Sequence, residues 1–240
     1  PVIQVQDLTM RFRIATNNVS GIKEYMIQTL RKQMSYKELY ALNHINFNVY
    51  RGEIVGIIGT NGSGKSTLLK IVSGALNPTS GQVSVDQSKV QLLTLGTGFD
   101  MELSAKENVY LNGAIIGYSR SFIDEHYQEI VDFAELEGFM EEKVKNFSSG
   151  MVSRLGFSIA TVAGAAEILI LDEPTVGLDP KQIIEIRSLI KDLSKEHTVI
   201  LSSHILSEVS ALCDQILIIS KGKLVACDTP QNLSSQMQGN

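Results

Sequence analysis

Residues 59–66 read Gly-Thr-Asn-Gly-Ser-Gly-Lys-Ser, a full match to the pattern G-x-x-x-x-G-K-[ST]. The apolar run 54–58 precedes this stretch and the helix-like segment 67–72 follows it, which is the strand–loop–helix context that the pattern requires. Glycines let the backbone curl so that successive N–H groups point inward, and the N-terminus of the helix adds positive potential. The stretch therefore predicts a binding site for a nucleoside triphosphate, rather than a glycine-rich turn that contains a lysine by chance. The residues expected to contact the nucleotide are Gly59, Asn61, Gly62, Ser63, Gly64, Lys65, Ser66 and Thr67.

Two carboxylates follow a second apolar run and supply another part of the predicted site. The run 168–171 ends in Asp172 and Glu173. In phosphate-loop NTPases this strand lies beside the one that leads into the loop, so Asp172 and Ser66 are expected to ligate Mg²⁺. Glu173 is then placed to polarise the attacking water as a general base. Without the loop, an apolar strand capped by a solvated acidic turn would explain the same residues.

Two further side chains are expected at the γ-phosphate. Lys65 in the loop is long enough to reach the β- and γ-phosphates. His204 lies just beyond another apolar run, 199–201. Because ligands bind at the carboxyl ends of the strands in open α/β sheets, this histidine is expected to sense the γ-phosphate. An exposed histidine, or one satisfied in the core, is the alternative.

Composition and charge limit the class of protein. The chain has 240 residues, 43% of them hydrophobic and 20% charged, which is enough for one large domain, with or without a subdomain. No apolar run approaches the roughly 20 residues that span a bilayer, and the N-terminal region has no signal-peptide pattern, so we expect any membrane role to act through partners. The net charge of −5 argues against a protein that coats nucleic acid. Cys213 and Cys227 lie far from any C-x-x-C spacing, which favours a reduced protein without a disulfide or a cysteine metal site.

The pattern of the remaining chain indicates an α/β fold. The alternating segments 2–5 and 45–49 predict strands with one buried face, and residues 100–160 show apolar side chains at helical spacing. Three apolar runs predict strands, at 168–171, 199–201 and 216–219. The two segments between them predict helices, at 181–194 and 205–213. This alternation favours a mostly parallel sheet with covered faces. Residues 221–223 predict a hairpin turn, and 234–240 a polar, frayed tail.

Residues 147–151 read Phe-Ser-Ser-Gly-Met, shortly before the strand that carries the two carboxylates. With this segment the chain resembles the ATP-binding cassette (ABC) family over essentially its whole length, where Leu-Ser-Gly-Gly-Gln is the usual form. The resemblance implies that Ser148, Ser149 and Gly150 make a second anion site, which clamps ATP held by another subunit. Taken alone, Ser148 is better explained as the N-cap of a helix over 150–162, a role that it can have together with the other.

The resemblance assigns two more residues and leaves one position open. Asp179 lies in the segment that contacts the opposite subunit in this family, and Tyr40 takes the place of the aromatic ring that stacks on adenine. A tyrosine that simply packs at the start of a strand is the alternative for Tyr40. The family's usual Gln is missing near Leu95–Gly96, and Gln91 lies four residues too early. The residue that replaces this Gln stays unassigned.

The resemblance also implies an architecture and a working assembly. It implies a phosphate-loop NTPase core over 1–98 and 160–240, with a mostly parallel sheet and an antiparallel β part near the N-terminus, a helical subdomain over 99–159 and an insertion over 14–39. The activity that it implies is hydrolysis of ATP with Mg²⁺ in a homodimer that sandwiches the nucleotide. Such a dimer is peripheral to the membrane, at its cytoplasmic face, and docks on a transmembrane permease.

Within the family, the front two-thirds resemble subunits that export polysaccharides, teichoic acids or O-antigens. The string 172–180 instead resembles general ABC-2-type exporters, whose substrates include lipids, drugs and peptides. A soluble ABC ATPase and a module that binds ATP without hydrolysing it are further alternatives. Within the insertion, an apolar stripe predicts an amphipathic helix, packed on its own sheet or against the membrane surface or the permease. The stripe consists of Ile22, Tyr25, Met26, Thr29, Leu30 and Met34.

Overall fold

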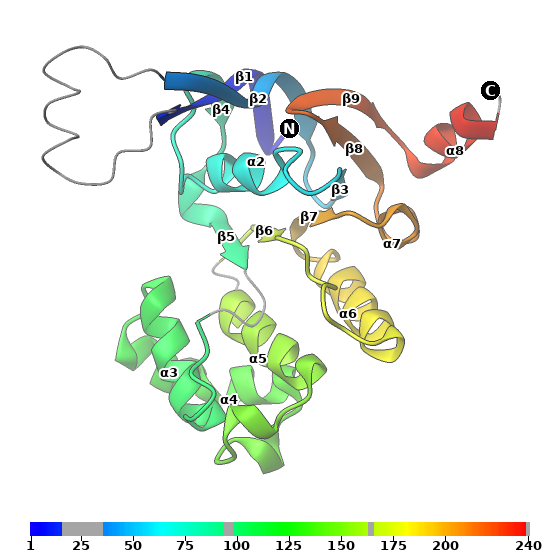
Figure 1. Ribbon diagram of the computed structural model, residues 1–240. Coiled ribbons are helices and arrows are strands. Elements are labelled where there is room, and N and C mark those ends of the chain that lie inside the picture. The colour runs from blue at the N-terminus through cyan, green and yellow to red at the C-terminus, as the bar shows by residue number, and fades with distance from the viewer. Residues whose placement is uncertain (16–35, 94–97, 163–165, 239–240) are drawn as a thin grey trace, which may run out of the picture.

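A computed structural model describes residues 1–15, 36–93, 98–162 and 166–238. The predicted amphipathic stripe and the positions Leu95–Gly96 lie outside these described residues. The described chain forms two sheets with helices around them, and the helices between residues 105 and 161 lie together below the sheets in Figure 1.

The larger sheet carries the predicted nucleotide site. Its strands run in the order β5, β6, β7, β3, β8, β9. They are β3 (Ile54–Ile58), β5 (Val90–Leu93), β6 (Ile168–Leu171), β7 (Thr198–Ser203), β8 (Gln215–Ser220) and β9 (Lys223–Asp228). The first five are parallel and β9 is antiparallel to β8, so the predicted mostly parallel sheet is confirmed. β3 lies between β7 and β8 and is buried on both faces, which explains why its five residues are apolar or glycine. The expectation that the carboxylate strand β6 lies directly beside β3 is wrong, because β7 is inserted between them.

The smaller sheet is antiparallel and is built mainly from the N-terminal part of the chain. Its order is β2, β1, β4, formed by β1 (Ile3–Ala15), β2 (Tyr36–Val49) and β4 (Ser80–Ser84). β1 and β2 are longer than the predicted strands and include the described ends of the predicted insertion. The predicted antiparallel part near the N-terminus is confirmed.

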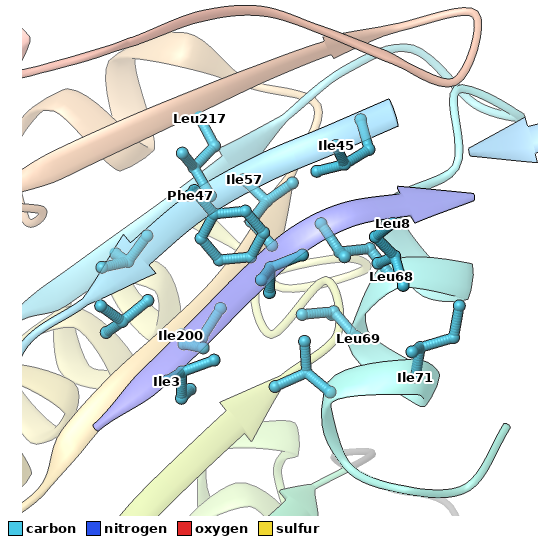
Figure 2. Packing of buried hydrophobic residues seen from close by; sticks show 14 of the residues in the cluster. Ile3, Leu8, Ile45, Phe47, Ile57, Leu68, Leu69, Ile71, Ile200 and Leu217 are labelled. Carbon is cyan, nitrogen blue, oxygen red and sulfur yellow. The ribbon is translucent and has the colours of Figure 1, made fainter. Parts of the chain in front are cut away.

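Helix α2 (Lys65–Val72) joins the two sheets through a shared core. Figure 2 shows side chains of α2 in the same cluster as those of both sheets. The labelled members are Ile3, Leu8, Ile45, Phe47, Ile57, Leu68, Leu69, Ile71, Ile200 and Leu217. Because this cluster packs against the helix that follows the phosphate loop, it fixes the direction in which the N-terminus of α2 points.

Helices of the second half of the chain cover the other face of the large sheet. A second core cluster there joins Phe157, Ile186, Val209 and Leu233 to β3, β6, β7 and β8. The helices are α5 (Ser149–Thr161), α6 (Pro180–Leu193), α7 (Leu206–Ser210) and α8 (Pro230–Gln238). The predicted helix over 205–213 is therefore shorter than expected. Among the described residues, no helix is both long and apolar enough to cross a membrane.

The helical subdomain has its own core. It contains α3 (Ala105–Ile116), α4 (Arg120–Ala134) and the beginning of α5, joined by a third cluster that includes Val109, Ile130 and Leu155. Short 3₁₀ turns complete the described elements, at Gln87–Lys89 (η1), Glu137–Phe139 (η2) and Val144–Asn146 (η3). Figure 1 shows α3, α4 and α5 grouped away from the antiparallel sheet.

The prediction of a frayed tail from residue 234 is wrong for the described part. α8 continues to Gln238. It begins at Pro230, a residue suited to the first turn of a helix, and Thr229 accepts the N–H groups of Asn232 and Leu233. Leu233 is buried against the large sheet and holds the helix in place.

The two cysteines are free, as the sequence predicts. Cys213 is buried in the second core cluster, and this burial raises the pKa of its thiol. The thiol therefore stays protonated at neutral pH and behaves as a small apolar side chain.

Candidate active site

The phosphate loop leads directly from β3 into α2. Gly64 lies at the N-cap of α2 with a φ of 112°, and a Cβ atom there would come within 2.4 Å of the Ala41 carbonyl oxygen. No side chain caps this helix, so its first-turn N–H groups are left for a ligand. This arrangement of an uncapped helix N-terminus after a tightly packed glycine suits an anion.

The β8–β9 turn is hydrogen-bonded to the phosphate loop. The N–H of Gly222 donates to the Ser63 carbonyl oxygen at 2.9 Å, and the Gly222 carbonyl oxygen accepts from Asn43 at 2.7 Å. Gly222 has a φ of 76°, and a Cβ atom there would lie 2.8 Å from the Ala41 oxygen. The Ser63 side chain is buried, and its hydroxyl has no partner among the described residues. Ser63 therefore contributes to the loop through its backbone.

Most of the residues predicted to bind the nucleotide line one cavity of about 350 Å³. Its lining consists of Phe12, Leu39, Tyr40, Ala41, Asn61, Gly62, Gly64, Lys65, Ser66, Thr67 and Glu173. A cavity of this size suits a small-molecule ligand. A larger cavity of about 480 Å³ lies at α4, α5 and α6, but none of the predicted site residues lines it.

Lys65 is almost completely buried and is surrounded by oxygen atoms. Its Nζ donates to the carbonyl oxygens of Gly59 at 2.8 Å and Thr60 at 3.4 Å, and it lies 3.2 Å from Glu173 Oε1. The Glu173 carboxylate is the only negative charge in this set. It lies beside Lys65 in a cavity that Ser66 and Thr67 of α2 also line, and a phosphate group could take this place, so the residues fit a triphosphate.

The carboxylates at the end of β6 are tied to β7. The Ser202 hydroxyl donates to Asp172 Oδ1 at 2.6 Å and accepts the Glu173 N–H at 2.8 Å. Glu173 has a φ of 50°, which is uncommon for a residue with a side chain. His204 Nδ1 lies 2.9 Å from Glu173 Oε2, so this carboxylate bridges Lys65 and His204.

The donor set also fits Mg²⁺. Within the described ranges, no group of three or more His, Cys, Asp or Glu residues could hold a metal ion by itself. Mg²⁺ at a nucleotide is normally held by one or two protein oxygens together with phosphate oxygens, so a carboxylate and a hydroxyl suffice. Asp172 and Ser66 offer these two groups at the ends of β6 and of the phosphate loop.

Ser148, Ser149, Gly150 and Asp179 do not line the cavity of their own chain. Ser148 caps α5, since its hydroxyl accepts the Met151 N–H at 3.2 Å, and Asp179 caps α6 through the Gln182 N–H at 2.9 Å. The cap interpretation of Ser148 is therefore correct. A role toward the nucleotide of a second subunit is compatible with it, because both side chains lie at helix N-termini.

Phe12 is a candidate that the sequence analysis missed. It lines the cavity together with Tyr40, and both rings are partly exposed. The register of β1 and β2 places Phe12 opposite Leu39 and Arg11 opposite Tyr40. Glu38 and a hydrogen bond with the Tyr40 side chain raise the pKa of Arg11. The Tyr40 hydroxyl is thus close to the Arg11 guanidinium, whereas Phe12 has no polar group and offers an entirely apolar ring to the cavity.

We expect Phe12→Ala to weaken ATP binding more than Tyr40→Ala does. Stacking of a base on an aromatic ring contributes about 1–3 kcal/mol, so the loss at Phe12 is expected to be about tenfold or more in Kd. Isothermal titration with Mg-ATP measures this, and Tyr40→Phe controls for the hydroxyl. A larger loss at Tyr40 than at Phe12 would place adenine on Tyr40, as the resemblance implies.

Comparisons with known proteins agree with a nucleotide-binding site at this cavity. A family model described as "ABC transporter" matches residues 42–176. The chain is 34% identical over 227 residues to the O-antigen export system ATP-binding protein RfbB of Klebsiella pneumoniae, covering 93% of this chain and 92% of that protein. It is 39% identical over 214 residues to the bacitracin transport ATP-binding protein BcrA of Bacillus licheniformis, covering 83% and 68%. It is 38% identical over 203 residues to the ABC transporter protein AbcA of Aeromonas salmonicida, covering 84% and 66%.

A solved structure supports the fold. The ATP-binding cassette MJ0796, in a dimeric post-hydrolysis state bound to ADP and Pi, superposes with a TM-score of 0.71 and 24% sequence identity. The match covers 95% of this chain and 98% of the solved one. At this identity the likeness establishes the fold of the chain.

Proposed function

The chain belongs to the ABC transporter family and is an ATPase of the cassette type, and on that premise we propose that two copies of it power the export of a polysaccharide through a membrane permease. The observation that carries the catalytic part is the bridge that Glu173 makes between Lys65 and His204 at the cavity. We place the dimer at the cytoplasmic face of the membrane, as a peripheral subunit.

The proposed hydrolysis uses groups that follow the carboxyl ends of three parallel strands, β3, β6 and β7. Lys65 and the N-terminus of α2 bind the β- and γ-phosphates. Ser66 and Asp172 offer oxygen ligands to Mg²⁺, which when bound neutralises charge on the phosphates. The triphosphate replaces the Glu173 carboxylate at Lys65, and the freed carboxylate accepts a proton from the attacking water. His204 holds the other oxygen of Glu173 and contacts the γ-phosphate.

We propose that the second half of each site comes from the partner subunit. Ser148, Ser149 and Gly150 would bind the γ-phosphate of the partner's ATP, and Asp179 would contact the partner near its phosphate loop. The support is that these residues lie at the starts of α5 and α6, outside the cavity of their own chain. ATP then binds the closed dimer better than the open one, which is the condition for driving a conformational change.

The proposed transport step links this closure to a permease. The helical subdomain, residues 99–159, has its own core and is the part that we expect to move with the permease. Export of a polysaccharide such as O-antigen or teichoic acid is supported by the sequence of residues 147–151 and by the similarity to RfbB. The similarity to BcrA keeps a drug or another substrate as the second candidate.

The substrate can be tested by inactivating the chain in its own cells. Replacing the genomic copy by Glu173→Gln is expected to remove the polysaccharide from the cell surface and to leave it inside the cell. Immunoblots of surface and total polysaccharide measure both amounts, with the wild-type copy restored as the control. Normal surface polysaccharide together with a loss of drug tolerance would contradict the polysaccharide proposal and favour the second candidate.

A further inference from the structure

Glu208 is a buried carboxylate that the proposed reaction does not use. It lies in α7, and only 8% of its surface is exposed. None of the described Lys, Arg or His residues forms an ion pair with it. A carboxylate this buried needs hydrogen-bond donors, because burial without them is costly.

Two hydroxyl groups supply these hydrogen bonds, and both reach the same oxygen. Thr175 donates to Glu208 Oε2 at 2.6 Å, and Ser203 donates to Oε2 at 3.2 Å. The Ser203 hydroxyl also accepts the Ile205 N–H at 3.0 Å. The bonds therefore connect the segment after β6 to the segment after β7.

These two segments carry the reacting groups. Thr175 follows Glu173 by two residues, and Ser203 directly precedes His204. Glu173 has a left-handed backbone conformation, which persists only where its surroundings fix it. Ser202 holds the N–H of Glu173 on one side, and the Thr175–Glu208 bond holds the chain on the other.

Glu208 lies outside the nucleotide cavity. Thr175, Ser203 and Glu208 line a cavity of only about 10 Å³, which is too small for a ligand, and Glu208 does not line the nucleotide cavity. Any effect of Glu208 on the reaction must therefore pass through the two segments that it joins.

We propose that Glu208 is a positioning residue for ATP hydrolysis, which keeps Glu173 and His204 at fixed positions relative to each other. It does so by accepting hydrogen bonds from Thr175 and Ser203. This inference rests on the proposed catalytic role of Glu173. Among the described residues, neither Lys65 nor the phosphate loop forms a hydrogen bond or ion pair with Glu208, and Glu208 does not line the nucleotide cavity. We therefore expect the effect on turnover and not on nucleotide binding. The charge of Glu208 is not what matters, because a neutral amide oxygen accepts the same two bonds.

The test is the steady-state ATPase rate of Glu208→Ala and Glu208→Gln. Glu208→Ala is expected to lower kcat about tenfold to a hundredfold, as small displacements of reacting groups do, with KM for ATP nearly unchanged. Glu208→Gln is expected to restore kcat. Ser207→Ala, an exposed neighbour on the same short helix, is the matched control and should behave as the wild type.

Thr175→Val keeps the test valid if Glu208→Ala does not fold. It removes one donor at constant shape and should by itself lower kcat with KM for ATP nearly unchanged. Where Glu208→Ala does fold, the two effects on kcat should not add, since both variants break the same bond. Wild-type kcat in a folded Glu208→Ala protein would overturn the proposal. So would equal losses in the Gln and Ala variants, or a rise in KM that matches the fall in kcat.

A readout without turnover separates this proposal from the proposed function. The imidazole NMR signal of His204, assigned with His204→Gln, should move in Glu208→Ala and stay in place in Glu208→Gln and Ser207→Ala. An unmoved signal overturns the positioning role. If the wild-type protein does not hydrolyse ATP with its permease, the proposed function fails, while the His204 signal still shows whether Glu208 fixes the position of that side chain.

Discussion

Glu173→Gln is expected to lower kcat for ATP hydrolysis by about a hundredfold to ten-thousandfold, the usual contribution of a general base. The amide keeps the shape of the side chain and cannot accept the proton of the attacking water. ATP binding should be preserved or tighter, because the wild-type carboxylate competes with the phosphates for Lys65 at 3.2 Å. Single-turnover hydrolysis and isothermal titration measure the two effects separately.

The same variant should trap the closed dimer. In size-exclusion chromatography we expect Glu173→Gln to elute as a monomer without nucleotide and as a dimer with Mg-ATP. Glu196→Gln, an exposed carboxylate outside the site, is the matched control and should keep full turnover. A variant that binds ATP and stays monomeric would mean that closure needs the permease, or that Ser148 serves only as a helix cap. Unchanged turnover in Glu173→Gln would show that another group is the base.

Lys65→Ala is expected to weaken ATP binding about tenfold to a hundredfold, and to abolish measurable turnover. A hydrogen bond to a charged group contributes about 1.5–3 kcal/mol, and the expected loss in affinity corresponds to the loss of one such bond. The loss in affinity stays moderate because Lys65 must first exchange its bonds to Gly59, Thr60 and Glu173 for phosphate oxygens. Turnover falls further, since Lys65 stabilises charge that develops on the phosphates during transfer.

Lys70→Ala provides the control for the loss of one positive charge. Lys70 lies on the same helix and is exposed, so its removal should leave affinity and turnover unchanged. Fluorescence titration with a nucleotide analogue measures affinity, and phosphate release measures turnover. Undiminished ATP binding in Lys65→Ala would mean that backbone N–H groups alone hold the phosphates.

Local patterns predicted the parts of the fold that neighbouring residues determine. The strand 54–58, the phosphate loop and the following helix are specified within 20 residues, and the structure has the strand at the predicted bounds. The strand 168–171 and the helix capped by Ser148 were predicted for the same reason. Each carries its own start, apolar pattern and stop.

The pairing of β1 with β2 could not be predicted in the same way. Its register shifts between Val5 and Leu8, between Leu8 and Met10, and between Met10 and Arg11. Each shift breaks the alternation of inward and outward side chains, so counting along the strand does not reveal which ring meets the cavity. For this reason Phe12 was missed, whereas Tyr40 was assigned from the resemblance to the ABC family.

Glu208 was missed for a related reason. An acid in a short polar helix normally faces solvent, and nothing in its own segment indicates burial. Its shortest hydrogen bond comes from Thr175, 33 residues earlier in the chain. Only the neighbouring positions of β6 and β7 in the sheet bring these side chains together.

The backbone hydrogen bonds that join Gly222 to Ser63 and Asn43 have a consequence for protein synthesis. The ribosome has made residues 59–66 long before it makes the turn that holds Ser63 and Asn43 in place. β3 itself acquires its two neighbours only when β7 and β8 have emerged. Such long-range pairing folds slowly and late. A nascent chain therefore carries the complete motif without the shape that binds ATP until β7, β8 and the turn that follows β8 have emerged, and nucleotide binding marks a chain whose large sheet is assembled.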